Sequence, residues 1–313
     1  MTATLQPEFA PSLIDPKTLM SIRNLELRAR LVVEGFWAGL HRSPYHGFSV
    51  EFTEYRPYTP GDDPRYLDWR VLARSDRYFL KRFEDETNLR CHLLADRSRS
   101  MAYSSIGYTK AEYAATLAAT LAYFLHLQGD AIGLLTFDEQ VRDYLPPRHR
   151  ISHLRQLMIA LEKPAAGRVT DLVAPLQRAA EITRKRGAIV LLSDFLAPIE
   201  QLEPALIRLA AGGHEIIIFH ILDPAEVSFE FKASTMFEDA ESGRLMMIDP
   251  AAARADYQRK LEAHCVAVRD ISQRLGGSYS RLVTNQPLEH ALLDFLRARS
   301  HRRVVRRSTT PRR

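Results

Sequence analysis

His-Leu-Leu-Ala-Asp-Arg-Ser-Arg-Ser-Met, residues 92–101, decides how the rest of the chain is interpreted. The apolar run over residues 91–95 predicts a buried strand, and three small oxygen-bearing side chains follow at alternate positions, Asp96, Ser98 and Ser100. Polar residues that begin where an apolar strand stops are typical of a parallel strand at the carboxyl edge of its sheet, where open α/β sheets bind ligands. A carboxylate and two hydroxyls suit a hard cation such as Mg2+. The alternative is a serine-rich loop that caps a helix.

The chain that follows residue 91 alternates between apolar runs of strand length and helical patterns. Strands are predicted over 91–95, 131–137, 188–192, 215–222 and 278–283, with an edge strand at 141–145 and a hairpin at 237–248. Helices are predicted over 110–128, 151–161, 172–184, 198–211, 251–275 and 287–299. Such alternation predicts a parallel sheet covered by helices on both faces. We therefore expect a doubly wound α/β domain over residues 91–300.

The ends of the chain have a different character. A helix is predicted to begin near Pro16. Residues 20–90 combine the rest of this helix with alternating apolar residues and turn sequences, which predicts a smaller, partly β N-terminal module. Residues 297–313 contain eight arginines and no acid, so the other 296 residues carry −3 of the chain's formal charge of +5. We expect residues 301–313 to be a basic, disordered tail.

Composition sets further limits. Cys91 and Cys265 fall inside an apolar strand and a helical pattern, so they are interpreted as small buried hydrophobes and not as a disulfide. The most apolar stretch, residues 114–127, is shorter than a bilayer crossing and contains two threonines and a histidine. The first residues do not have the pattern of a signal peptide. We expect a soluble cytoplasmic protein.

Two further oxygen-bearing residues are expected near the first three. Thr170 precedes the helix predicted from residue 172, and Asp194 directly follows the strand over 188–192. Each has an ordinary explanation: Thr170 and Asp171 could cap a helix, and Ser193-Asp194 could be a strand-ending turn. The loops at the carboxyl ends of neighbouring parallel strands converge, however, so together these residues give five oxygen ligands from three loops.

This set resembles the metal-ion-dependent adhesion site of von Willebrand factor type A domains. Asp96-x-Ser98-x-Ser100 matches the first motif of that site, Thr170 its lone threonine and Asp194 its second acid. Residues 20–300 also resemble one branch of these proteins, the domain-of-unknown-function fifty-eight family. That resemblance is carried by Tyr58-Thr-Pro-Gly-Asp-Asp-Pro-Arg65, Asp68-Trp69, Ala73-Arg74 and Phe237-Glu-Asp-Ala-Glu-Ser-Gly243.

The resemblance implies a function. In the wider family the hydroxyls usually touch the metal ion, the acids often act through water, and a partner protein supplies one more carboxylate. A protein-binding module holding Mg2+ or Mn2+ is therefore implied. Members of the branch are companions of MoxR-type AAA+ ATPases, so the resemblance implies an ATPase, or its client, as the partner. Arg97 and Arg99, at the variable positions of the first motif, are expected to point outward.

Other features of the sequence bear on alternative functions. The charged stretch at residues 62–74 is interpreted as a turn and a salt-bridged segment that packs Trp69, with a second ligand surface as the alternative. Neither a phosphate-binding glycine loop nor a Gly-x-Ser-x-Gly nucleophile motif is present, so we do not expect ATP hydrolysis or an enzyme. The alternatives are a Mg2+-dependent phosphohydrolase that uses Asp96 and Asp194, and a nucleic-acid-binding protein that acts through the arginine tail.

Overall fold

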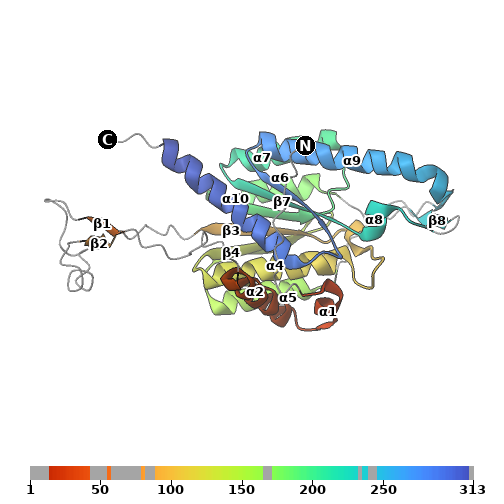
Figure 1. Cartoon of the computed structure of the whole chain (residues 1–313). Coiled ribbons are helices and arrows are strands. Elements are labelled where there is room, and N and C mark those ends of the chain that lie inside the picture. The colour runs from red at the N-terminus through yellow and green to blue at the C-terminus, as the bar shows by residue number, and fades with distance from the viewer. Residues whose placement is uncertain are drawn as a thin grey trace, which may run out of the picture.

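The computed structural model describes residues 14–42, 55–57, 79–81, 89–164, 171–231, 235–238 and 245–309. Its centre is a six-stranded sheet in the order β10–β7–β6–β3–β4–β5 (Figure 1). The strands are β3 (Arg90–Asp96), β4 (Ala131–Phe137), β5 (Val141–Arg148), β6 (Ala188–Ser193), β7 (Glu215–Leu222) and β10 (Ser278–Val283). Neighbours pair in parallel except β4 and β5, which are antiparallel. The predicted mostly parallel α/β fold is confirmed.

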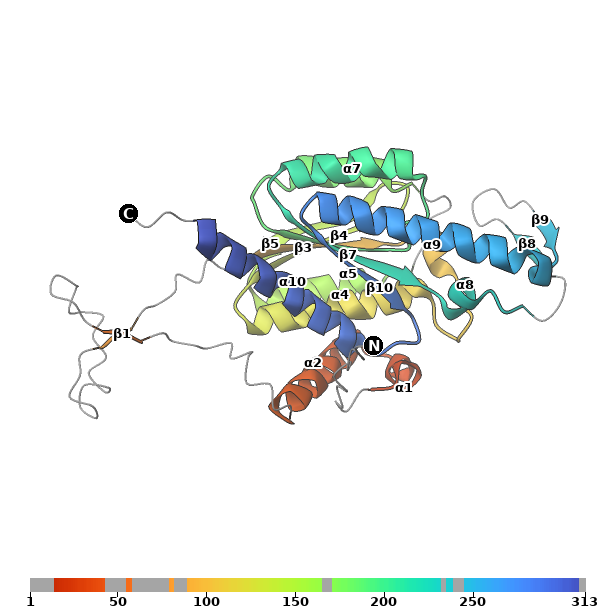
Figure 2. The same ribbon diagram turned by 45° about the horizontal axis from the view of Figure 1, so that its top comes forward.

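Helices cover both faces of this sheet (Figure 2). One face packs against α2 (Leu25–Arg42), α4 (Lys110–Leu127), α5 (Ile151–Glu162) and α10 (Leu288–Thr309). The other packs against α6 (Val173–Ile182), α7 (Ile199–Ala211) and α9 (Pro250–Arg274). Alternate side chains of a strand point to opposite faces, so Leu93 lies in the first core and Leu94 in the second. The chain is therefore doubly wound around a sheet with two hydrophobic cores.

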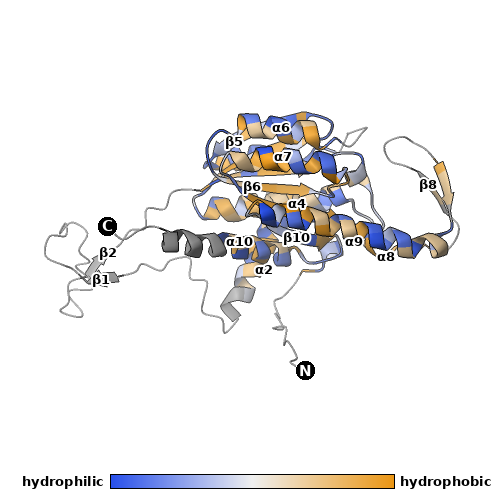
Figure 3. Cartoon of the chain, turned by 90° about the horizontal axis from the view of Figure 1, so that it is seen from above, coloured by the Kyte–Doolittle hydropathy of each residue, from blue (hydrophilic) through white to orange (hydrophobic). Residues whose placement is uncertain are grey.

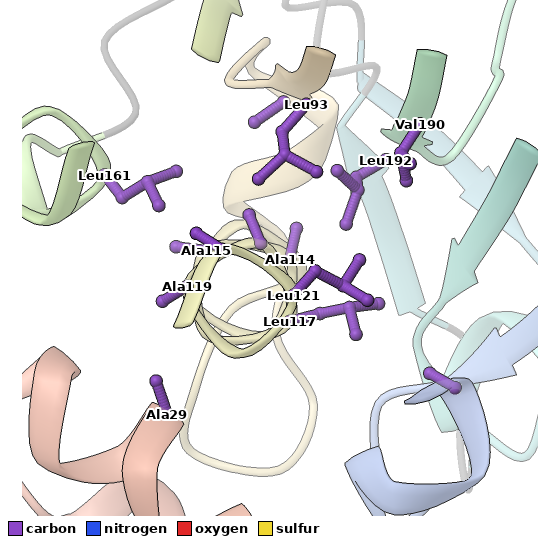
Figure 4. Packing of buried hydrophobic residues seen from close by; sticks show 14 of the residues in the cluster. Ala29, Leu93, Ala114, Ala115, Leu117, Ala119, Leu121, Leu161, Val190 and Leu192 are labelled. Carbon is purple, nitrogen blue, oxygen red and sulfur yellow. The ribbon is translucent and has the colours of Figure 1, made fainter. Parts of the chain in front are cut away.

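Helix α4 is the central helix of the first core. It begins with a capping box: the Thr109 hydroxyl accepts from the Glu112 amide at 3.1 Å, and the Glu112 carboxylate accepts from the Thr109 amide at 2.7 Å. A helix that is apolar all round must be buried, and α4 lies between the sheet and α2. Figure 4 shows Leu117 and Leu121 on the side of the strands and Ala119 on the side of Ala29.

The described part of the N-terminal module is mostly helical. Helices α1 (Pro16–Ser21) and α2 contribute Leu19, Val32 and Phe36 to the first core. Strands β1 (Tyr55–Pro57) and β2 (Phe79–Lys81) pair antiparallel as a separate two-stranded sheet. The sequence signatures between residues 58 and 74, including Trp69, lie outside the described residues. The helical part of the module thus shares the core of the main domain.

Strand β5 ends the sheet on the side away from β10. It contains Pro146 and Pro147, and its pairing with β4 shifts register between Leu145 and Arg148. A Cβ added to Gly133 on β4 would lie 2.8 Å from the Leu145 carbonyl oxygen and 2.9 Å from the Pro147 nitrogen. Only glycine permits so close an approach of the two backbones. The predicted edge strand is confirmed, with a local irregularity opposite this glycine.

The C-terminal part differs from expectation in one respect. The predicted hairpin is present as β8 (Thr235–Glu238) and β9 (Leu245–Ile248), and Met236 and Met247 are exposed on it; Figure 3 shows β8 as an apolar element beside the main body. Helix α10 continues to Thr309, whereas we expected disorder after residue 300. Arginine is a good helix former, and neither glycine nor proline interrupts the chain between residues 288 and 309. Among the described residues, no helix is long and apolar enough to cross a bilayer.

Candidate functional site

Three loops meet at the carboxyl ends of β3, β6 and β7. The loop after β3 contains a 3-10 turn, η2 (Ser100–Ala102), and leads into α4. The chain after β6 begins with Asp194, and β7 leads into the short helix α8 (Pro224–Ser228). The three strands are adjacent and parallel, so these ends lie at the same edge of the sheet (Figure 1). We call the cluster of polar side chains at these strand ends the crevice.

Asp96, the last residue of β3, lies at the base of the crevice and is buried. One carboxylate oxygen accepts from the Ser98 amide at 2.8 Å and the other from the Ser193 hydroxyl at 2.6 Å. The Ser193 hydroxyl in turn accepts from the Phe195 amide at 3.0 Å. The Asp96 side chain therefore joins the loop after β3 to the loop after β6.

Ser98 and Ser100 lie beside Asp96 with their hydroxyl oxygens 3.1 Å apart, and both side chains are buried. Adjacent ligands of an octahedral Mg2+ ion, each about 2.1 Å from the metal, are about 3.0 Å apart. A carboxylate with two hydroxyls is also an all-oxygen donor set of the kind that Mg2+ and Mn2+ take. The described residues therefore fit a divalent cation at this position.

Asp194 forms the opposite wall of the crevice and is paired with a lysine. The Lys110 ammonium donates to the Asp194 carboxylate at 2.8 Å and to the Glu226 carboxylate at 2.6 Å. The Lys110 and Asp194 side chains are fully buried. Lys110 is the first residue of α4, so one side chain of this helix contacts acids from two other loops.

The Glu226 carboxylate is itself held in place. Its second oxygen accepts from the Asp223 amide at 2.8 Å in the capping box of α8. The buried Asp223 carboxylate accepts from the Ala225 amide at 2.8 Å and from the amide and hydroxyl of Ser105. Ser105 belongs to the loop after β3, so a continuous polar network connects all three loops.

The electrostatics of the crevice follow from burial and charge. Burial, and next the nearby Asp194 carboxylate, raise the pKa of Asp96, although hydrogen bonds from Ser193 and Ser98 oppose this rise. Burial also raises the pKa of Glu226, against the effect of Lys110. For Lys110 burial acts to lower the pKa, but Asp194 and Glu226 outweigh burial and raise it. The Lys110 ammonium is thus charged, whereas burial and the Asp194 carboxylate disfavour the ionised form of Asp96.

The structure brings together four of the five predicted ligands, Asp96, Ser98, Ser100 and Asp194. Thr170 lies outside the described residues. The Asp171 carboxylate accepts from the amides of Val173 and Ala174. Asp171 therefore caps the start of α6, as the helix-capping alternative predicts. Arg97 points away from the crevice but is not exposed: its guanidinium donates to the carbonyls of Ala160 and Leu161, both at 2.8 Å.

Three crevice residues were not predicted: Lys110, Glu226 and Ser193. Lys110 and Asp194 are 84 positions apart, and only the fold brings them together. A local signal did exist, because a lysine at the first position of a helix faces the positive end of the helix dipole and needs a compensating anion. Beyond Asp194, Phe195 has φ of 51° in the left-handed region, and its carbonyl accepts from the His264 ring at 2.8 Å. This strained residue turns the chain away from the crevice.

Comparisons with known proteins show the family of the chain. Residues 54–267 match the family model described as Protein of unknown function DUF58. The uncharacterized proteins Mb1516 of Mycobacterium bovis and Rv1480 of Mycobacterium tuberculosis are each 30% identical over 295 residues, covering 92% of this chain and 91% of theirs. The structure thus defines an α/β protein whose crevice is lined by acids and hydroxyls. The chain belongs to the DUF58 family.

Two solved structures are similar in outline. An aerotolerance-related membrane protein from Bacteroides fragilis aligns with a TM-score of 0.48 at 17% identity, over 67% of this chain and 98% of that one. The conserved hypothetical protein BatB from Bacteroides thetaiotaomicron aligns with a TM-score of 0.45 at 14% identity, over 68% and 99%.

Proposed function

We propose that this protein is a metal-dependent protein-binding module that acts in the cytoplasm as an adaptor or co-chaperone. The observation that carries the proposal is the pair of buried hydroxyls, Ser98 and Ser100, 3.1 Å apart beside the Asp96 carboxylate. The resemblance to adhesion sites of von Willebrand A domains supports Mg2+ or Mn2+ as the ion and Thr170 as a further ligand. A bound divalent ion supplies positive charge at the mouth of the crevice.

The residues of the chain explain how such a site selects a partner. Ser98, Ser100 and Thr170 are neutral donors and leave the charge of a cation largely uncompensated. Asp96 and Asp194 are buried, and each carboxylate is already hydrogen-bonded within the protein. An acidic side chain of a partner is therefore the complementary group, and it binds in a partly dry space where the effective dielectric is below that of water. By family resemblance the partner is a MoxR-type AAA+ ATPase or its client, in protein maturation or complex assembly.

A second candidate is a Mg2+-dependent phosphohydrolase that uses the same crevice. One observation favours it: the Lys110 ammonium lies among carboxylates, as phosphate-binding lysines do beside metal sites. Against it, Lys110 is fully buried and already donates to two carboxylates, so a phosphate could not reach it without breaking those bonds. Release of nitrophenol from p-nitrophenyl phosphate with Mg2+, lost in Asp96→Asn, would favour the enzyme over the adaptor.

The adaptor is tested by binding to a purified MoxR-type ATPase from the same source, with surface plasmon resonance in Mg2+ and in EDTA. We expect EDTA to release the ATPase and Mg2+ to restore it, and we expect Ser98→Ala to weaken binding without changing the melting temperature in EDTA. Ser104→Ala, on the same loop but outside the predicted ligand set, is the matched control. Equal binding in EDTA and Mg2+ would contradict metal dependence.

A further inference from the structure

The crevice contains a positively charged side chain, the Lys110 ammonium. Lys110 donates from one ammonium to Asp194, which follows β6, and to Glu226, which follows β7. Its own helix follows β3. The ammonium therefore connects the same three strand ends whose loops form the predicted metal site.

Without its contacts to Asp194 and Glu226, the buried position of the Lys110 ammonium would be energetically unfavourable. A fully buried ammonium loses its hydration, and at the first residue of α4 it also faces the positive end of the helix dipole. Its two carboxylate partners compensate both costs. The nearest other buried cation on this loop, Arg97, donates to the carbonyls at the end of α5 and leaves the crevice acids to Lys110.

The Lys110 ammonium offsets part of the negative charge in the crevice. Asp96, Asp194 and Glu226 are three carboxylates, linked through Ser193 and Lys110, against one ammonium. When all four groups are ionised, Lys110 reduces the negative charge of these three carboxylates from −3 to −2. Without the lysine the charge would be −3, and without Glu226 it would be −1.

We propose that Lys110 is a resident cation of the crevice that holds the three loops together without a metal ion and limits how tightly the crevice binds a divalent cation. This inference rests on the metal site of the proposed function. It follows that the protein folds without metal and that its ion exchanges readily. A divalent ion beside Asp96 experiences repulsion from the ammonium and shares Asp194 with it.

The experiment measures Mn2+ binding by isothermal titration calorimetry on chelator-treated full-length protein. Lys110→Met removes the ammonium, and we expect Mn2+ to bind roughly tenfold tighter or more. Glu226→Gln removes a negative charge from the same network, and we expect Mn2+ to bind roughly tenfold weaker or more. Lys260→Met is the matched control, because Lys260 pairs with Asp256 at 2.7 Å on the exposed face of α9. Its affinity should equal that of wild type.

Opposite shifts separate this role from mere packing, since damage to the network would weaken binding in both variants. Tighter binding in Lys110→Met, including binding where wild type shows none, supports the proposal. Equal or weaker binding in folded Lys110→Met overturns it and leaves the metal site standing. An absence of Mn2+ binding in wild type and in both variants overturns the proposal and the metal site together. If Lys110→Met does not fold, Lys110→Gln removes the charge but keeps a hydrogen-bond donor, and tighter Mn2+ binding in that variant supports the proposal whereas equal or weaker binding overturns it.

Discussion

At the residue scale, Asp96 accepts a hydrogen bond from the Ser98 amide and another from the Ser193 hydroxyl. An asparagine at this position can accept from the Ser98 amide through its side-chain oxygen and donate to the Ser193 hydroxyl through its side-chain nitrogen. Because burial disfavours the ionised carboxyl, Asp96→Asn should unfold in EDTA at a temperature equal to or above that of wild type.

The same variant should lose the stabilisation by metal. At an Mg2+ concentration 100 times the dissociation constant, wild type should gain about 2.7 kcal/mol, which differential scanning calorimetry detects as a rise of several degrees. Asp138→Asn is the control. The Asp138 carboxylate lies on the turn before β5 and pairs with Arg142, at the start of that strand. A rise of equal size in Asp96→Asn would show that the ion binds elsewhere.

His92 gives the chain a predicted pH dependence. Burial lowers its pKa to about 4, and its Nδ1 atom has no hydrogen-bond partner among the residues that the structure describes. A histidine whose pKa is lower in the folded state contributes stability above the unfolded value of about 6.5, and this stability is lost as the pH falls toward 4. The free energy of unfolding should therefore fall by about 1.4 kcal/mol per pH unit through this one group.

Urea denaturation between pH 6.5 and 4.5 measures that slope. His92→Gln should flatten the slope, whereas His290→Gln, at an exposed position of α10, should leave it unchanged. Parallel pH profiles for wild type and His92→Gln would refute the assignment.

The sequence was sufficient for the crevice residues that follow a strand directly. Asp96 and Asp194 could be placed because strand ends in a parallel sheet converge, which depends on local patterns alone. Lys110 and Glu226 could not, since their contacts depend on the lengths and directions of the helices α4, α5, α6 and α7 that lie between them in the chain. The burial of Arg97 against α5 could not be foreseen for the same reason, because the helix end whose carbonyls it contacts lies more than 60 positions away.

At the scale of elements, Arg97 fixes helix α5 to the end of β3. Its guanidinium is mostly buried and donates to two carbonyls of the last turn of α5, where the helix dipole also favours a cation. Arg97→Met should lower the free energy of unfolding by about 2–4 kcal/mol, because it leaves these carbonyls without their donor.

Chemical denaturation with urea measures this loss, and Arg155→Met, at an exposed position of the same helix, should change it by less than about 0.5 kcal/mol. The rise in melting temperature with Mg2+ should persist in Arg97→Met. A loss within the range of the Arg155 control would mean that α5 is held by its apolar face alone.

Strands and helices were predicted well where a hydrophobic period was strong. The buried strands β3, β4, β6 and β7 lie within a few residues of the predicted ranges because their apolar runs have no alternative but the sheet interior. The end of α10 was not predicted because the arginine-rich segment has little apolar area and no hydrophobic period, whereas the helix needs only the good helical propensity of arginine.

At the scale of the whole molecule, Arg299 joins α10 to the core, and it is the last such contact among the side chains that the structure describes. Its guanidinium donates to Gln128 at 3.0 Å and to Asp130 at 3.2 Å, and Asp130 in turn accepts from the Leu89 amide at 3.0 Å. Residues 301–313 contain only Val304, Val305 and Pro311 as apolar residues, too little apolar area to stabilise the fold.

A chain that ends at residue 300 should therefore melt within about one degree of the full chain, and a chain that ends at 298 should melt a few degrees lower. Thermal unfolding followed by circular dichroism compares the two. If the chain ending at 300 already melts several degrees lower, residues 301–313 contribute to the fold.

The two prolines of β5 have a consequence for association between copies of the molecule. Successive backbone N–H groups of a strand point to opposite sides, so Pro146 and Pro147 remove one donor facing β4 and one facing outward. The first loss explains the shifted register opposite Gly133. The second leaves a gap in the row of donors that an incoming strand would need. Edge-to-edge polymerisation of this sheet is therefore obstructed at β5, and the obstruction is built into the backbone, so it persists in the absence of any ligand.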